Sequence, residues 1–255
     1  MTNITEETIG YPHPNGRLIE FHSHILPDMD DGSQSVEESL EMIRAEAAQG
    51  VFCIAVTPHF YADRDRPEIF LAKRRKQLTD LRKRIGDPYP VLLAGAEVQY
   101  FSGLTVMEML PSFCLENTNL LLVEMPFDKW GNRVLEDIGY LRDRFGIQPV
   151  IAHIERYIQY QPAGTLEKLL QNGILIQSNV SFFTDRRTQH KAIRMLGEGK
   201  IQLIGSDCHN MTTRPPKLGE CYETLRENMG GEVVDKVIRD SLQILYQGRK
   251  HKLSL

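Results

Sequence analysis

Five histidines and four acidic residues of this sequence stand at the ends of short apolar runs or in the loops that follow them. They are His22, His24, Asp31, His59, Glu97, Glu124, His153, Asp207 and His209. Imidazole and carboxylate ligands without a thiolate suit manganese, iron or zinc, and they argue against a structural zinc site of the cysteine type. Because nine ligands are too many for one ion, the set predicts two or three divalent metal ions.

The spacing of His22 and His24 favours binding of one ion by both rings. Residues two apart on an extended strand point to the same side, so the two imidazoles can act together. A single buried histidine is more often a hydrogen-bonded core residue than a ligand, and one H-x-H pair is a weak signal. Here the other acidic and histidine residues add to the pair. An apolar interior cannot hold so many polar groups without compensating charge, which metal cations supply.

Short apolar runs alternate with helical patterns along the chain, which predicts a parallel α/β fold. The runs resemble strands covered on both faces, and they span 18–21, 51–57, 91–94, 120–125, 149–152, 174–177 and 201–205. Helical patterns span 36–49, 67–85, 131–145, 165–172, 186–198, 215–228 and 232–247. In an α/β barrel the carboxyl ends of the strands form one rim, where catalytic residues gather. We expect one barrel domain over 18–255 and a separate N-terminal extension over 1–17.

The composition excludes several classes of protein. The formal charge is −4, from 30 basic and 34 acidic residues, whereas nucleic-acid coats and polybasic membrane binders need excess positive charge. No apolar run approaches the ~20 residues of a spanning helix, and the first ten residues lack the features of a secretory signal. Four widely spaced cysteines favour free thiols in a reducing compartment. We expect a cytoplasmic protein that binds no nucleic acid and is not inserted in a membrane.

Several blocks of the sequence carry a family resemblance. They are F-H-S-H-I-L-P at 21–27, D-D-G at 30–32, T-P-H at 57–59, G-A-E at 95–97, V-I-A-H-I-E-R-Y at 150–157, S-D-C-H-N at 206–210 and R-P-P at 214–216. Together they resemble the PHP (polymerase and histidinol phosphatase) superfamily, and more narrowly its capsular and exopolysaccharide tyrosine-protein phosphatase branch. The match runs from about residue 18 to near the C-terminus, and the H-I-E-R-Y and S-D-C-H-N blocks make it specific.

The resemblance implies a distorted (β/α)7 barrel that holds a centre of three metal ions, with manganese favoured over iron and zinc. The first ion would take His22, His24, Glu97 and Asp207, the second Glu97, Glu124 and His153, and the third Asp31, His59 and His209. Arg156 and Arg214 match the two arginines that contact phosphate in the family. The family often has Asp where this chain has Glu20, and we expect Glu20 to orient a ligand rather than to bind metal.

The resemblance also implies a reaction, the hydrolysis of phosphotyrosine by direct attack of a hydroxide that bridges two metal ions. Paired ions lower the pKa of water toward ~7, and arginines neutralise the non-bridging phosphate oxygens. Tyrosine phenolate, with a pKa near ~10, is a fairly good leaving group. The implied substrate is a phosphotyrosine protein, the tyrosine-rich tail of a bacterial membrane kinase that controls capsular or exopolysaccharide synthesis.

Three alternatives compete with this interpretation. A small-molecule phosphatase of the histidinol-phosphatase type would typically carry His where this chain has Asp31 and Glu124. A catalytically silent metal-binding module would be expected to lack one or more ligands. Cysteine-dependent tyrosine phosphatases share the C-x5-R spacing of Cys208 and Arg214, but their phosphate-binding loop is normally eased by glycine, and the segment 208–214 has none.

Overall fold

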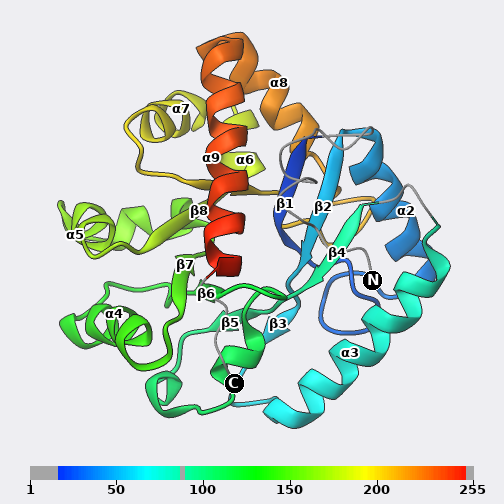
Figure 1. Ribbon diagram of the computed structural model, residues 1–255. Coiled ribbons are helices and arrows are strands. Elements are labelled where there is room, and N and C mark those ends of the chain that lie inside the picture. The colour runs from blue at the N-terminus through cyan, green and yellow to red at the C-terminus, as the bar shows by residue number, and fades with distance from the viewer. Residues whose placement is uncertain (1–16, 87–89, 251–255) are drawn as a thin grey trace.

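Parallel strands form a curled sheet in the computed structural model, which describes residues 17–86 and 90–250 (Figure 1). The strands are β1 (Leu18–Ser23), β2 (Val51–Val56), β3 (His59–Phe60), β4 (Val91–Ala94), β5 (Glu97–Gln99), β6 (Leu120–Glu124), β7 (Gln148–Ile151), β8 (Leu175–Asn179) and β9 (Leu203–Gly205). They pair in the orders β1-β2-β4 and β3-β5-β6-β7-β8-β9. This mixed α/β fold with a curled parallel sheet confirms the predicted class.

Two of the predicted strands are each followed, after a short interruption, by a further short strand. The run at 51–57 leads through Pro58, which has no N–H to donate, into β3. The run at 91–94 leads through Gly95 and Ala96 into β5. Hydrogen bonds continue across both interruptions, since Gly95 N donates to Val56 O at 2.9 Å and Glu97 N donates to Pro58 O at 3.1 Å. The chain therefore keeps its direction through each break.

The last strand returns to the first. Asp207 N donates to His22 O at 2.8 Å, and His24 N donates to Cys208 O at 2.9 Å. Ser23 and Cys208 also form a parallel bridge. These contacts bring the segments that follow β1 and β9 together, although the two segments are far apart in the sequence.

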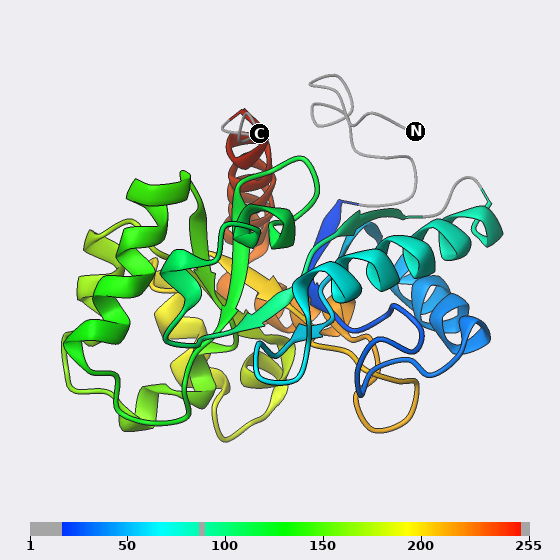
Figure 2. The same ribbon diagram turned by 90° about the horizontal axis from the view of Figure 1, so that it is seen from below.

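Most of the helices lie on the outer side of the sheet (Figures 1 and 2). The helices are α2 (Val36–Ala48), α3 (Pro67–Arg84), α4 (Asn132–Phe145), α5 (Thr165–Gln171), α6 (Val180–Thr184), α7 (Gln189–Gly197), α8 (Leu218–Met229) and α9 (Gly231–Lys250), with 3-10 turns η1 (Leu104–Val106), η2 (Leu110–Phe113), η3 (Ile154–Arg156) and η4 (Ile158–Tyr160). Ser35 caps α2, because its side chain accepts from Glu38 N. Helix α6 has only five residues and no predicted counterpart.

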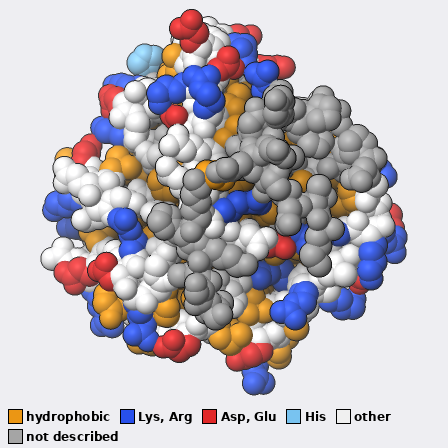
Figure 3. Space-filling model, viewed as in Figure 1, with side chains coloured by type: hydrophobic (Ala, Val, Ile, Leu, Met, Phe, Trp, Pro, Cys, Tyr) orange, Lys and Arg blue, Asp and Glu red, His pale blue; other side chains and the backbone are white. Residues whose placement is uncertain are grey.

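The two ends of the sheet differ in what covers them. Helix α9 (red in Figure 2) lies at one end, where Asn119 N, just before β6, donates to Gly248 O at 3.1 Å. The loops that follow β1, β3 and β9 gather at the other end. Figure 3 shows the α9 side, where basic and acidic side chains are interspersed over the coloured part. Among residues 17–86 and 90–250, no helix has the length and apolar character needed to cross a membrane.

Apolar side chains from strands all around the sheet meet in one buried cluster. It includes Phe21 of β1, Ala55 of β2, Leu93 of β4, Leu122 of β6 and Leu203 of β9. A second and larger cluster packs the strands against the helices. The strands are therefore buried on both faces, as their unbroken apolar runs predict.

Candidate metal centre

Four buried side chains meet near the ends of β1, β5 and β9. The Nε2 atoms of His22 and His24 lie 3.1 Å apart. Glu97 Oε2 lies 3.1 Å from the first of these atoms and 3.4 Å from the second. Asp207 Oδ1 lies 3.5 Å and 3.3 Å from the same two atoms. The structure thus brings together the four residues that the family resemblance assigns to the first ion.

Hydrogen bonds outside this cluster select the nitrogen that each ring turns inward. His24 Nδ1 donates to Asp30 Oδ2 at 2.7 Å. His22 Nδ1 faces Gln177 Oε1 at 3.3 Å. Both partners are acceptors, so the proton resides on Nδ1 and the lone pair on Nε2. An outer acceptor that fixes the ring in this way is typical of metal-binding histidines.

Asp31, His59 and His209 form a neighbouring group. Asp31 Oδ1 lies 3.7 Å from His59 Nε2 and 3.4 Å from His209 Nε2. The Nδ1 of His209 donates to the backbone oxygen of Asp207 at 2.9 Å, which leaves its Nε2 free. His24 belongs to this group as well, because its ring lies 4.4 Å from that of His59 and 3.9 Å from that of His209. The residues expected to bind the third ion are therefore adjacent.

A third group forms around Glu97 and Glu124. His153 Nε2 lies 2.7 Å from Glu97 Oε1 and 3.9 Å from Glu124 Oε1. His59 Nδ1 lies 2.9 Å from Glu97 Oε2, and potential ligand atoms of His59, Glu97 and Glu124 all lie within 4.8 Å of one another. The structure therefore places His59 as well as His153 beside the two glutamates, whereas the resemblance assigns only His153 to the second ion.

The unsatisfied atoms of this cluster fit the presence of cations. His153 Nδ1, His209 Nε2 and Glu124 Oε2 are buried and have no hydrogen-bond partner among residues 17–86 and 90–250, a costly state for polar atoms. Burial and the negative charge of Glu97 raise the pKa of Glu124 to about 7. Divalent cations would bind the lone pairs and compensate the negative charge. We call the nine residues from His22 to His209 that the sequence singles out the candidate metal centre.

Two arginines flank the centre. Arg156, in η3, and Arg214, in the loop after β9, place Nη2 atoms 2.5 Å and 2.7 Å from Asp207 Oδ2. Their side chains are 35% and 37% exposed, so both can also meet a ligand from solvent. Although burial opposes ionisation, His22 and His24 hold the pKa of Asp207 well below its usual value. Asp207 therefore stays ionised between the histidines and the arginines.

The backbone is strained or tightly packed at several points of the centre. His153 and Asp207 have φ values of 30° and 55°, in a region that residues other than glycine seldom adopt. Such strain is typical of functional sites. A Cβ atom at Gly205 would lie 2.7 Å from the Cβ of His22, so only glycine lets β9 approach β1 this closely.

Some residues that support the centre were not identified from the sequence. Asp30 binds His24 Nδ1, and Gln177 Oε1 accepts from the backbone N–H of His153 at 2.7 Å. Asn179 Nδ2 donates to Asp207 Oδ2 at 2.8 Å. Gln177 and Asn179 stand two residues apart at the end of β8. In the sequence, Gln177 ends the one apolar run that is followed by no candidate ligand, and Asn179 stands two residues further on. These two polar residues were the signal available.

A buried acidic pair lies behind the centre. Glu20 Oε1 accepts from the backbone N–H groups of His22 at 2.8 Å and of Ser206 at 2.9 Å, which agrees with its expected orienting role. Burial raises the pKa of Glu20 to about 7. Burial and the charge of Glu20 raise the pKa of Glu46, on α2, well above its usual value. We call Glu20 and Glu46 the acidic pair.

Replacing Glu46 with glutamine is expected to make the stability of the metal-free protein less dependent on pH. A carboxyl whose pKa is raised by folding stabilises the fold below its unfolded pKa, and this contribution is lost as the pH rises toward the folded pKa. Glu46→Gln removes the titration of a carboxyl whose pKa is raised well above its usual value, so above pH ~4.3 the free energy of unfolding should fall more steeply in wild type than in the variant. Urea denaturation in chelator at several pH values measures this fall. An equal fall in Glu46→Gln would contradict the prediction.

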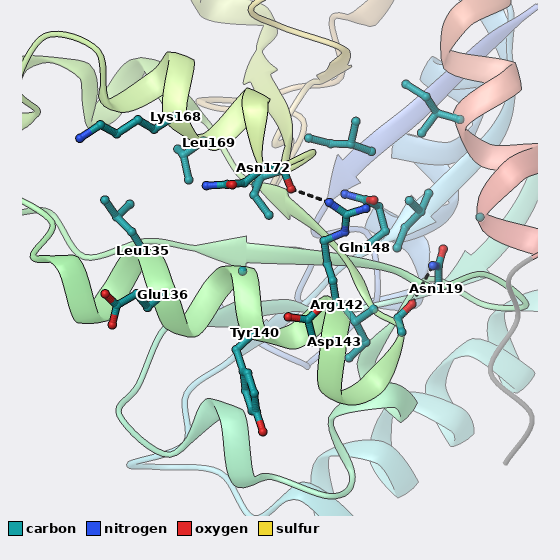
Figure 4. A pocket seen from close by; sticks show the side chains of 18 of the residues that line it. Asn119, Leu135, Glu136, Tyr140, Arg142, Asp143, Gln148, Lys168, Leu169 and Asn172 are labelled. Carbon is teal, nitrogen blue, oxygen red and sulfur yellow. Dashed lines mark hydrogen bonds between the residues drawn. The ribbon is translucent and has the colours of Figure 1, made fainter.

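A groove of about 1050 Å³ lies away from the metal centre (Figure 4). It is lined by α4, α5 and α9 and by residues at the starts of β6, β7 and β8. On its wall, the guanidinium of Arg142 donates to the backbone oxygen of Asn172 at 2.5 Å. None of the nine residues of the centre lines this groove. It is therefore not the candidate site.

Comparisons with known proteins agree with this geometry. The family model described as capsular polysaccharide synthesis, CpsB/CapC, matches residues 18–246. Tyrosine-protein phosphatase CpsB of Streptococcus agalactiae serotype III (strain NEM316) is 30% identical over 243 residues, which cover 89% of this chain and 97% of that protein. Tyrosine-protein phosphatase YwqE of Bacillus subtilis (strain 168) is 31% identical over 227 residues, covering 85% of this chain and 87% of that protein.

A solved structure also matches. It comes from a study of YwqE from Bacillus subtilis and CpsB from Streptococcus pneumoniae, which are described as unique metal-dependent tyrosine phosphatases. The TM-score is 0.77 at 26% identity, with 91% of this chain and 95% of the other chain covered. The family model, the relatives and the solved structure all cover most of the chain. The chain therefore belongs to the CpsB/CapC family of capsular polysaccharide synthesis proteins.

Proposed function

We propose that this chain is a metal-dependent protein-tyrosine phosphatase, a phosphoric monoester hydrolase. The observation that carries the proposal is the position of Asp207. Its Oδ1 faces the imidazoles of His22 and His24, while its Oδ2 forms ion pairs with Arg156 and Arg214. One carboxylate thus connects candidate metal ligands to two guanidinium groups, which suit phosphate oxygens. The relatives named as tyrosine phosphatases support the same chemistry.

We propose three metal ions. The imidazole and carboxylate ligands suit manganese, iron or zinc, and the family resemblance favours manganese. The residues that would hold them are His22, His24, Glu97 and Asp207 for the first, Glu97, Glu124 and His153 for the second, and Asp31, His59 and His209 for the third. Glu97 is shared, since its two oxygens face different histidines. The position of His59 also allows it to support the second ion.

The side chains of this protein would do the remaining work. When bound, the metal ions would lower the pKa of water and polarise the phosphoryl oxygens. Arg156 and Arg214 would donate hydrogen bonds to non-bridging oxygens as negative charge shifts during the reaction. Tyrosine phenolate has a pKa near ~10, so a dedicated proton donor is less necessary than for a serine phosphate. With no side-chain nucleophile assigned, water would attack phosphorus directly.

The curled sheet would correspond to the distorted (β/α)7 barrel of the PHP superfamily. Counting β2 with β3 and β4 with β5 as single interrupted strands reduces the nine segments to seven. The contacts between the ends of β1 and β9 support closure. We propose one domain over 18–255, and the family match over 18–246 supports most of it. The extension expected at 1–17 lies outside the described residues except for Arg17.

The proposed substrate is a phosphotyrosine protein in the cytoplasm, the tyrosine-rich tail of a membrane kinase that controls capsular or exopolysaccharide synthesis. The side chain of Asp31 is 69% exposed, so the centre is open to solvent on that side. An extended and flexible tail could reach such an open site. The family description, capsular polysaccharide synthesis, supports this role.

Two assays with added manganese test the proposed function. Hydrolysis of p-nitrophenyl phosphate distinguishes an enzyme from a silent metal-binding module. The kcat/KM for a phosphotyrosine peptide is then compared with that for histidinol phosphate. We expect a higher kcat/KM for the peptide. A higher value for histidinol phosphate would instead favour a small-molecule phosphatase on the same fold.

Replacing Cys208 with serine should leave most of the activity. Cys208 is buried, its Sγ lies 3.8 Å from Glu46 Oε1, and burial together with the charge of Glu46 raises the pKa of its thiol well above the usual value. A thiol of this kind is a poor nucleophile. We expect kcat/KM of Cys208→Ser to stay within about threefold of wild type, because no bond to substrate is lost. Loss of activity with metal content unchanged would support thiol catalysis instead.

A further inference from the structure

Phe127 presents an exposed aromatic ring beside the candidate metal centre. Its side chain is 52% exposed. Its ring lies 6.5 Å from that of His153, at an interplanar angle of 20°, and 5.1 Å from that of Tyr157. The exposed aromatic residues of the described chain are Phe127, Tyr140 and Tyr160. Of these, Phe127 is the one whose ring stacks on the ring of a residue of the centre, His153.

The loop that carries Phe127 is held in place on both sides of the ring. Before it, Met125 N donates to Tyr157 Oη at 3.1 Å. After it, the indole N–H of Trp130 donates to Pro126 O at 2.9 Å. Gln161 holds the same loop by donating to Asp128 O at 2.8 Å. The ring is therefore presented by a fixed loop rather than by a loose one.

Tyr61, an aromatic side chain next to the centre on the β3 side, is differently placed. Its ring stacks on that of His59 at 5.1 Å, and the guanidinium of Arg64 lies 5.0 Å from its centroid. Neighbouring groups thus already contact this ring. Phe127 instead leaves about half of its surface open. Single exposed apolar side chains are common, and Ile69 is one without such a setting, at 59% exposed.

We propose that Phe127 binds the aromatic ring of the substrate and so selects aryl phosphates over alkyl phosphates. This inference rests on the proposed phosphatase function. In phosphotyrosine a single ester oxygen joins the ring to phosphorus, so a phosphate at the centre places the ring just outside it. Phe127 lies beside His153, so a ring that leaves the centre on this side would meet it. The phosphate esters of serine and of histidinol place an alkyl carbon there, so no ring is attached directly to the ester oxygen.

The energetic effect of such a contact sets the size of the expected result. Aromatic pairs contribute beyond the area they bury, and losing one should weaken binding by roughly 2- to 12-fold. The fixed loop adds to this, because a ring that is already ordered loses little freedom on binding. An alkyl ligand makes no stacking contact and should be almost unaffected by loss of the ring.

Binding of two phosphonates to the manganese-loaded full chain tests the inference. Phenylphosphonate carries the ring, methylphosphonate does not, and neither can be hydrolysed at a phosphate ester bond. Isothermal titration calorimetry should show that wild type prefers phenylphosphonate by about tenfold. We expect Phe127→Ala to lose this preference, Phe127→Tyr to keep it, and Ile69→Ala, an exposed control on α3, to keep it. Metal content measured on each variant verifies that the centre is intact.

The outcomes separate the inference from the function on which it rests. Equal affinity of wild type for both phosphonates, or an unchanged preference in Phe127→Ala, would overturn the role of Phe127 and leave the phosphatase function standing. Equal weakening of both ligands in Phe127→Ala would also overturn it, because the ring would then support the centre in general. If wild type bound neither phosphonate and hydrolysed no phosphate ester, the proposed function itself would fail.

Discussion

His22→Ala is expected to lower kcat/KM for p-nitrophenyl phosphate by at least about a thousandfold, because metal ions contribute several kcal/mol and ~1.4 kcal/mol is tenfold in rate. His22 Nε2 faces Glu97, Asp207 and the other histidine of the H-x-H pair within 3.5 Å. Alanine removes a ligand from the most buried part of the centre. It also leaves the two carboxylates facing each other with less positive charge between them.

A second variant separates loss of metal from loss of fold. Gln177 supports His22 from outside at 3.3 Å without itself facing the proposed ions. Gln177→Leu should reduce activity by about 10- to 100-fold, the usual effect of removing an outer partner of a metal ligand. Excess manganese should partly restore Gln177→Leu but not His22→Ala. A folded His22→Ala protein with nearly wild-type activity would contradict the proposed metal set.

Arg156→Ala and Arg214→Ala should each lower kcat by about 100- to 1000-fold, as when a donor to developing negative charge is removed. Both guanidinium groups meet at Asp207 Oδ2, and both are about one-third exposed. The double variant should lose less than the product of the two single effects, because residues that act on the same group are not additive. Steady-state kinetics with a phosphotyrosine peptide measures these values.

Lysine variants serve as the matched controls for the arginines. Arg156→Lys keeps the charge but loses the planar pair of donors, so it should recover only part of the activity. Metal content should stay at the wild-type level in all of these variants, since the arginines are not ligands. If alanine at either position lowered the metal content and the activity in parallel, the arginine would be stabilising Asp207 rather than phosphate.

The residues of the centre could be predicted because strand ends and residue types can both be recognised from short stretches of sequence. An apolar run followed by His, Asp or Glu marks a strand end, and parallel strands bring their ends to one side. For this reason His22 and Asp207, which are far apart in the sequence, could be expected to meet. In the structure His22 Nε2 lies 3.5 Å from Asp207 Oδ1. The α/β class followed from the same alternation of runs and helices.

Other features depend on contacts that no local pattern contains. Gln177 reaches His22 across 155 positions of sequence, and its type alone does not indicate a partner. The interruption after β2 lies beside the one after β4, because Val56 pairs with Ala94 before them and His59 pairs with Glu97 after them. His59 lies beside Glu97 and Glu124 as well as in the group around Asp31. The sequence does not indicate this second set of neighbours. Phe127 gains its setting from Tyr157 and Trp130, which fix its loop from outside the strand.

Metal content of the purified protein tests the central claim most directly. The chain would be purified without added metal, dialysed against manganese, and analysed by mass spectrometry of metals and by anomalous diffraction. We expect three manganese ions, each beside imidazoles and carboxylates of the nine residues, and we expect a chelator to remove both the ions and the activity. Crystals grown with ample manganese that showed no ion among these side chains would contradict the claim.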